Sequence, residues 1–307
     1  MKNITSLFLL LILFGFGCAQ TERLESDFDP QRGSATSPDG EEASQEGPFE
    51  RTLKTAISSD GLTYVSNDLW ISDQANVPDA LIKENGDVYL YYTGWMVGDL
   101  LNTTAVAISQ DNGNSWIFKY LELTGTPEGI YRVVDPDVIL LPDGTVRMYF
   151  TSGNPQGIHY AESLDGITFE YKSSIFVPSN NIAIDSTTFK IGDTWHMYAL
   201  SQGGVEKLWH LTSLDGIRFS VYGITSFPKA SSFLVPANGM WIDDRFYLSL
   251  FGSDGSISSS WSKNGFDWYP SDESPLEPTG NEVYVKDPTM VPLKNGQYLM
   301  IYVTNTQ

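Results

Sequence analysis

The stretch Ser163-Leu164-Asp165-Gly166-Ile167-Thr168-Phe169 decides the fold, because variants of it recur along the whole chain. In each copy an Asp or Asn can cap a tight turn, the Gly can take a positive φ, and an aromatic residue follows. The period is roughly 50 residues, and self-similarity at such a period indicates a repeat architecture. The other four copies begin at Ser58, Ser109, Ser213 and Ser262.

A second repeated unit lies between these copies and consists of two β-rich runs around a polar turn. This pattern is typical of a β-hairpin. The chain shows no amphipathic helix pattern of useful length, so the sequence predicts an all-β fold. The five hairpin units span residues 78–93, 136–151, 185–200, 236–250 and 288–304.

The first motif resembles the Asp-box of sialidase-like β-propellers. With blade strands named A to D, the 78–93 unit and its equivalents are A-B hairpins and the Asp-box units are C-D hairpins. The folded chain starts with a C-D hairpin (residues 50–65) and ends with an A-B hairpin (residues 287–304). Pairing these halves removes the exposed edges of a linear array. The sequence therefore predicts a five-bladed β-propeller closed by its two ends. A linear array or two sandwiches would not explain the half-units.

The first 18 residues have the features of a bacterial lipoprotein signal peptide. A positive charge at Lys2 precedes an apolar run, residues 4–16, that is short for a transmembrane span. Gly17-Cys18 resembles a lipobox, whose cysteine is lipidated, although Gly15 departs from the usual leucine. We expect an exported protein anchored by lipid at Cys18 to a bacterial membrane, at the outer membrane or cell surface. An ordinary cleaved signal is the alternative.

The remaining chain divides by composition. Residues 19–48 are rich in Glu, Asp, Ser, Gly and Pro without apolar periodicity, which predicts a disordered acidic tether before the propeller at residues 49–307. A net charge of -20 argues against nucleic acid or an anionic membrane surface as a partner. Because Cys18 is the only cysteine, the folded body has no disulfide and no thiol for chemistry. We expect a monomer.

Chain direction places the D-to-A connectors and B-to-C loops on one rim, and the A-B turns and Asp-boxes on the opposite face. Alignment on the turn glycines puts three aspartates in one column at the start of strand A, namely Asp135, Asp185 and Asp287, with Val77 and Val235 in the same column. The next row reads Pro78, Pro136, Ser186, Pro236 and Pro288. Asp79 and Asp137 follow one residue later and lie on the same side of the strand as the column.

This acidic column has two interpretations. The aspartates either cap the strand starts or converge near the axis as a chemical site. Converging carboxylates raise one another's pKa, so that one stays protonated while another acts as base, which is the division of labour that glycoside hydrolysis needs. The same ring could instead hold Ca²⁺, which prefers carboxylate and carbonyl oxygens. No cofactor is otherwise required.

Two segments carry a family resemblance. Val134-Asp135-Pro136-Asp137-Val138 and Lys286-Asp287-Pro288-Thr289-Met290 look like the inner strands of the five-bladed glycosidases of glycoside hydrolase families 43 and 32 and their relatives. The resemblance extends over residues 50–304 and implies an Asp as base or nucleophile, an Asp that modulates pKa, and a Glu as acid. Asp135, Asp185 and Asp287 would fill the aspartate roles, in an order that remains open.

The catalytic acid is where the sequence departs from that family. Family 43 enzymes usually carry a Glu on an inner strand of a later blade, whereas the fourth blade reads Val235-Pro236-Ala237-Asn238-Gly239. The first blade also has Val77 where such enzymes often place the catalytic Asp. Glu128 and Glu282 lie on connectors into Asp-bearing strands, so they are the candidate acids; each could also be an ordinary solvated residue.

Further residues of the same rim are predicted to bind substrate. Trp95, Tyr131 and Tyr284 could stack on sugar faces, although rim aromatics also serve protein partners. The predicted substrate contacts also include Asp79, Asp137 and Arg132.

Other functions fit less well. A sialidase would need three converging guanidinium groups, whereas Arg218 and Arg245 fall on the opposite face. His159, His196 and His210 are expected to be isolated on strands of different blades, which disfavours a zinc site. We expect a glycoside hydrolase acting on an oligosaccharide or polysaccharide. The alternative is a non-catalytic surface lipoprotein that binds glycan or protein through the same rim.

Overall fold

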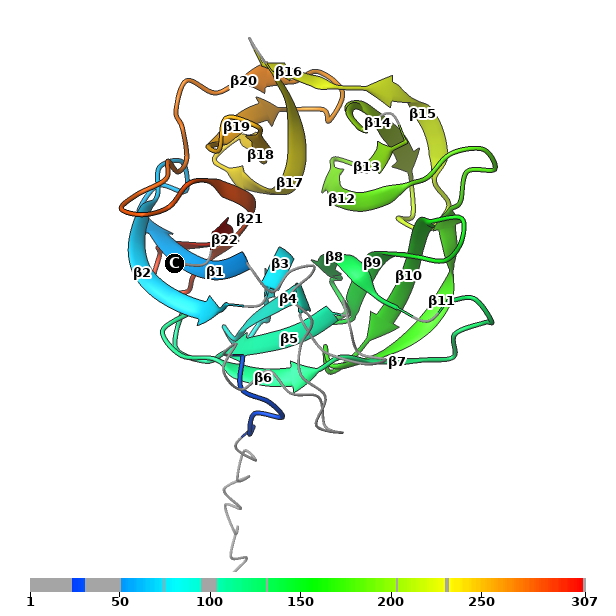
Figure 1. Cartoon of the computed structure of the whole chain (residues 1–307). Coiled ribbons are helices and arrows are strands. Elements are labelled where there is room, and N and C mark those ends of the chain that lie inside the picture. Colours follow the sequence, from blue (N-terminus) through cyan, green and yellow to red (C-terminus); the bar gives the residue numbers. More distant parts are fainter. Residues whose placement is uncertain are drawn as a thin grey trace, which may run out of the picture.

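The computed structural model describes residues 24–30, 51–73, 75–94, 104–130, 132–202, 204–229 and 232–305. Five β-sheets stand in a ring around one axis (Figure 1), with β3, β8, β12, β17 and β21 innermost. The predicted all-β, five-bladed propeller is confirmed. The described part of the chain contains no helix long and apolar enough to span a bilayer. Cys18, Trp95 and Tyr131 lie outside the described residues.

Each blade is built on antiparallel strands that follow one another in sequence, except that β7 adds a parallel strand to blade 2 and that one blade joins the two ends of the chain. Blade 1 contains β3 (Ala75–Ile82), β4 (Val88–Gly94), β5 (Thr104–Ser109) and β6 (Ile117–Tyr120). Blade 2 contains β8 (Val134–Leu140), β9 (Val146–Ser152), β10 (Gly157–Ser163) and β11 (Thr168–Phe176), with β7 (Glu122–Thr124) added parallel to β11. Blade 3 contains β12 (Ile184–Ile191), β13 (Thr194–Ser201), β14 (Gly204–Ser213) and β15 (Ser220–Thr225). Blade 4 contains β16 (Phe227–Lys229), β17 (Ser232–Ile242), β18 (Arg245–Gly252), β19 (Ile257–Ser262) and β20 (Tyr269–Pro270). Blade 5 contains β21 (Val285–Pro292), β22 (Tyr298–Asn305), β1 (Arg51–Ser58) and β2 (Val65–Ser72).

Blade 5 is assembled from strands at opposite ends of the folded chain. β1 pairs antiparallel with β22 over the whole length of both strands, from Arg51 opposite Asn305 to Ser58 opposite Tyr298. The backbone of β22, the last strand, is thereby hydrogen-bonded to that of β1, the first. The hairpin of β21 and β22 therefore does not expose an unpaired strand edge.

Apolar side chains on both faces of the second strands fill the space between blades. All residues of β4 and of β9 are buried, as expected for strands covered on both sides by neighbouring sheets. Three equivalent tyrosines add a polar contact, because each hydroxyl donates to the carbonyl of the Asp-box glycine in the next blade. The donor–acceptor distances are 2.8 Å for Tyr91–Gly166, 2.6 Å for Tyr149–Gly216 and 3.0 Å for Tyr198–Gly265.

The Asp-boxes are closed turns that touch the preceding blade. In the copy of blade 2, Asp165 Oδ1 accepts hydrogen bonds from the Ile167 and Thr168 N–H groups at 2.8 and 2.9 Å, and Ser163 Oγ accepts one from Gly166 N at 2.8 Å. Gly166 has φ +84°, and a Cβ there would lie 2.9 Å from the Tyr91 hydroxyl. Gly166 is therefore needed twice: it allows the left-handed turn, and its missing Cβ lets blades 1 and 2 pack closely.

Residues 24–30 correct the prediction of a disordered tether over 19–48. In the structure they lie along β6 at the outer edge of blade 1 (Figure 1). Phe28 packs its ring between those of Phe118 and Tyr120, with centroid distances of 5.8 and 4.9 Å. The contact combines the Phe28 ring with hydrogen bonds and an ion pair to β6, and the overall composition of the segment gives no sign of it.

Replacing Gly166 by Ala tests whether the close approach of Tyr91 adds a loss of stability to the one that the left-handed turn causes by itself. Gly144 is the matched control, because it has φ +86° and open space where its Cβ would be. We expect Gly144→Ala to cost about 1 kcal/mol of unfolding free energy from its left-handed backbone, and Gly166→Ala about 2 kcal/mol more from overpacking against Tyr91. Urea unfolding measures both, and equal losses would contradict the blade contact.

Candidate active site

The acidic column coincides with a backbone irregularity shared by four blades. Val77, Asp135, Asp185 and Asp287 have φ of 45°, 51°, 54° and 44°. Each lies where the ladder between the first two strands of its blade shifts register. Bulges of this kind re-aim side chains, and left-handed backbone costs a non-glycine residue about 1–2 kcal/mol. The four residues that the sequence aligns in one column at the strand starts therefore share one backbone conformation.

The fourth blade shows that part of the predicted alignment is wrong. Its register shift falls between Pro236 and Gly239, so Ala237 occupies the column position and Asn238 the proline row. The predicted Val235 and Pro236 are therefore two residues too early. The alignment relied on turn glycines, and this blade has none: Asp243 takes the left-handed conformation in the turn, with φ 52°.

The three aspartates are linked to neighbouring blades and to one lysine. The Asp135 N–H donates to Thr93 Oγ1 at 3.2 Å, and the Asp185 N–H donates to Thr151 Oγ1 at 3.0 Å. Asp287 Oδ2 forms an ion pair with the Lys286 ammonium at 2.6 Å. The first two contacts cross a blade boundary, whereas Lys286 and Asp287 are neighbours on β21.

Burial and mutual repulsion change the acidity of two of these groups. Burial raises the pKa of Asp135 to about 6; the hydrogen bond from Thr151 lowers it in part, and the charge of Asp287 raises it further. Burial raises the pKa of Asp185 well above its usual range, with added repulsion from Asp135 and Asp287. Lys286 offsets part of both shifts. Raised pKa values of this kind let a carboxyl group hold its proton at a pH where an ordinary aspartate is ionised.

The axial pocket beside these residues is narrow. Asp185 and Asp287 line it together with Val77, Ala237 and Phe251, and its volume is about 20 Å³. A space of this size holds about one water molecule. A water or a small substrate group can reach the carboxylates, whereas a whole sugar ring must lie above them on the rim.

A ring of hydrogen bonds, which we call the belt, lies immediately beyond the column. Its five side chains occupy the inner strands and each bonds to the backbone of the following blade. The belt consists of Asp79 (to Val138 N, 2.7 Å), Asp137 (to Thr188 N, 3.2 Å), Thr187 (to Ala237 O, 2.7 Å), Asn238 (to Met290 N, 3.1 Å) and Thr289 (to Ala80 N, 2.9 Å).

The belt gives Asp79 and Asp137, the predicted substrate contacts, further partners, and Asp79 also lines the axial pocket; contact with substrate stays a prediction. Asp79 also accepts hydrogen bonds from Asn238 and Thr289 at 2.8 and 2.9 Å, and Asp137 accepts one from Ser186 at 3.0 Å. Burial raises the pKa of Asp79 to about 6 and that of Asp137 well above its usual range. Both carboxyl groups thus join blades. Sequence reasoning missed Asn238, Thr187 and Thr289 because the belt mixes residue types.

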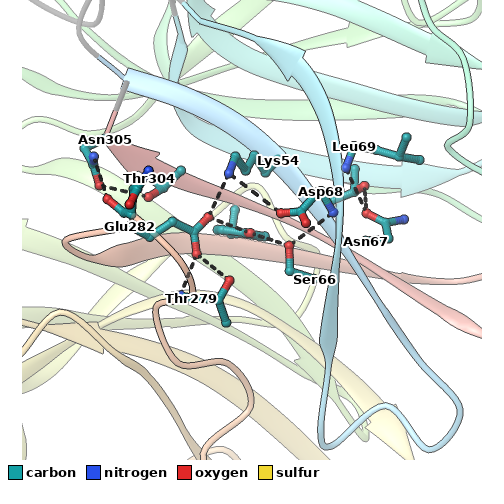
Figure 2. A network of polar contacts seen from close by, with 12 residues as sticks. Lys54, Ser66, Asn67, Asp68, Leu69, Thr279, Glu282, Thr304 and Asn305 are labelled. Atoms are coloured by element: carbon teal, nitrogen blue, oxygen red, sulfur yellow. Dashed lines mark hydrogen bonds and ion pairs between the residues drawn. The ribbon is translucent and has the colours of Figure 1, made fainter. Parts of the chain in front are cut away.

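Glu282 does not line the axial pocket but belongs to a network of polar contacts (Figure 2). Its side chain is 1% exposed and accepts hydrogen bonds from Tyr302 Oη at 2.9 Å and Thr279 N at 2.9 Å, with Lys54 Nζ at 3.3 Å. Lys54 lies on β1 and Tyr302 on β22, so Glu282 fastens the connector before β21 to the joined blade. The connector folds back onto partners distant in sequence, and the role of Glu282 as catalytic acid stays a prediction.

The other predicted rim residues are dispersed. Glu128 is exposed on the connector between β7 and β8, and Arg132 is half-buried near its end. Tyr284 packs against Arg51, whose guanidinium lies 5.3 Å from the ring centre and donates to the tyrosine hydroxyl at 2.5 Å. The structure brings none of these three into the axial pocket.

The histidines differ from their predicted isolation. His196 on β13 and His210 on β14 belong to the same blade, and His196 Nδ1 lies 3.0 Å from His210 Nε2. Burial lowers the pKa of each to about 4. Across the described residues, no three His, Cys, Asp or Glu side chains are grouped closely enough to hold a metal ion.

The molecule is thus a five-bladed propeller with carboxyl groups at the strand starts on its axis. Solved structures with this fold include a putative glycoside hydrolase from Parabacteroides distasonis, at 14% identity and TM-score 0.58, covering 87% of this chain and 96% of that one. An α-L-arabinofuranosidase from Lactobacillus brevis has 13% identity, TM-score 0.57 and coverage of 75% and 83%. The GH43 protein BlXynB from Bacillus licheniformis has 17% identity, TM-score 0.54 and coverage of 80% and 50%. No protein-family profile and no curated protein matches the chain.

Glu282→Gln tests the structural assignment of this residue. Loss of its charge leaves the mostly buried Lys54 with only the exposed Asp68, at 4.0 Å, as an ionised partner, so we expect unfolding free energy to fall by about 3 kcal/mol. In the Lys54→Met background the same change should cost less, because the lysine charge is already absent. Urea unfolding measures the cycle. A stable Glu282→Gln variant that loses glycan turnover would instead support the catalytic role.

Asp135→Asn tests the raised pKa of this carboxyl group. The folded state holds the Asp135 proton more tightly than the unfolded chain, so ionisation at this site removes stability as pH rises from about 4 through about 6. Since Asn cannot ionise, the variant should match wild type near pH 4 and exceed it by about 2 kcal/mol near pH 7.5. Exposed Asp193→Asn is the control. A difference that does not depend on pH would contradict the assignment.

Proposed function

We propose that the protein is a glycoside hydrolase that cleaves an oligosaccharide or polysaccharide at its acidic rim. The observation that carries the proposal is the set of three aspartates in equivalent left-handed bulges, two with raised pKa values and the third paired with Lys286. The glycosidase fold of its structural neighbours agrees with this function.

The acidities favour a division of roles among the three residues. Asp185, with the pKa raised well above normal, is the candidate general acid that gives its proton to the leaving glycosidic oxygen as the C–O bond breaks. Asp287, paired with a cation, is the candidate carboxylate that attacks the anomeric carbon or takes a proton from the attacking water. Asp135 precedes both in the chain, and its charge helps to raise the pKa of Asp185, so it is the candidate residue that modulates the acid.

A binding protein without catalysis is the second candidate. The observation that favours it is the volume of the axial pocket, about 20 Å³, together with the absence of both candidate glutamates from its lining. In that case the same rim would hold a glycan by its hydroxyl groups, and no bond would break.

We also propose that the chain is exported and held at a bacterial membrane by lipid on Cys18. The support is the signal-like residues 1–18 and the lipobox-like Gly17-Cys18. This part of the proposal is independent of the chemistry at the rim.

Single replacements of the rim aspartates by Asn separate the two functions. Asp135→Asn, Asp185→Asn and Asp287→Asn would be assayed on plant and algal glycans and aryl glycosides, with Asp193→Asn as control. If the protein is a hydrolase, Asp185→Asn and Asp287→Asn should lower kcat at least about 100-fold, the usual contribution of an acid or base. Glycan binding by wild type without turnover, lost in the variants, would establish the binding protein instead.

A further inference from the structure

Residues 24–30 dock on blade 1 through backbone, ionic and aromatic contacts. Asp27 N donates to Phe118 O at 2.8 Å, and Phe118 N donates to Ser26 Oγ at 3.1 Å. Lys119 Nζ forms an ion pair with Asp27 Oδ1 at 2.5 Å. With Phe28 between two aromatic rings, the segment covers the outer edge of β6 much as an added strand does.

The docked segment has a defined direction between the two faces of the propeller. At its beginning, Leu24 and Glu25 share a groove with Asp111 and Trp116 of the blade 1 Asp-box. At its end, the Pro30 carbonyl accepts a hydrogen bond from Ser72, the last residue of β2, at 3.2 Å. Ser72 starts the connector into β3, on the acidic rim. The segment therefore rises from the Asp-box face towards the acidic rim.

The length of chain before Leu24 limits where Cys18 can lie. Only residues 19–23 separate the two, so Cys18 lies within about 20 Å of Leu24 even if the chain is fully extended. For an undocked random coil of the same length, the distance from Cys18 to Arg51 would average about 30 Å and could reach about 110 Å. Docking converts a long tether into a short one that leaves from the Asp-box face.

We propose that the docked segment orients the propeller on the lipid surface, with the Asp-box face towards the bilayer and the acidic rim directed away from it. The proposal rests on the lipid anchor at Cys18 and does not depend on glycan hydrolysis. The partner is the bilayer itself, reached through the lipid. The outward rim leaves the candidate site open to large glycans that could not enter a gap beside a membrane.

Energy transfer from single engineered cysteines to headgroup-labelled lipids tests this orientation in reconstituted full-length lipoprotein. The chain has no cysteine other than Cys18, so one dye reports one position. Leu164→Cys, 82% exposed in the blade 2 Asp-box, and Val283→Cys, 77% exposed on the rim connector of blade 5, flank blade 1 on opposite faces. A seven-residue strand such as β9 is about 23 Å long. We expect the Leu164→Cys dye to lie about 20 Å closer to the bilayer.

Undocking variants show whether the segment causes the orientation. Phe28→Ala combined with Asp27→Ala should reduce the difference between the two dyes by more than half, whereas Glu25→Ala, an exposed side chain in the same segment, should preserve it. A Val283→Cys dye as close to the bilayer as the Leu164→Cys dye would overturn the proposal, as would a difference unaffected by undocking. Equal membrane binding of wild type and Cys18→Ala would overturn the lipid anchor itself. None of these measurements depends on whether the protein hydrolyses glycans.

Discussion

Hydrogen bonds from the inner strand of one blade to the backbone of the next are the constraint on which this structure depends. Inner strands diverge from one another around the axis, so their backbone groups cannot form a ladder across blades and need other partners. Asp79, Asp137 and Asn238 accept N–H groups there, and Thr187 and Thr289 complete the ring. The acidic residues near the axis therefore form two groups. Asp79 and Asp137 belong to the belt, whereas Asp135, Asp185 and Asp287 lie in the bulges at the rim.

The bulge lets neighbouring positions of one strand serve these two purposes. In blade 2, the left-handed Asp135 lies at the rim, whereas Asp137 is held in the belt two residues later. The strain of such a residue persists only where its surroundings fix it. Here the belt fixes the strand on one side, and the threonine contact from the neighbouring blade fixes it on the other. The chemistry of the rim therefore depends on the same contacts that join the blades.

Local pattern predicted the fold and part of the site, and long-range contacts determined the rest. The Asp-box period and the two half-units were sufficient for a five-bladed all-β propeller, because each turn and hairpin is encoded within a few residues. The column of Asp135, Asp185 and Asp287 followed from spacing alone. Alignment failed in blade 4, where Asp243 replaces the turn glycine. Glu282 could not be assigned because its partner Lys54 lies at the other end of the folded chain.

The central claim is that the rim carboxyl groups have different acidities in the free protein. Carboxyl-carbon NMR titration of protein labelled at aspartate measures this directly, with Asp135→Asn and Asp185→Asn assigning the two signals. We expect an Asp135 signal that titrates near pH 6 and an Asp185 signal whose pKa lies well above the usual range of aspartates. Ionisation of both groups near pH 4, as for ordinary exposed aspartates, would contradict this claim.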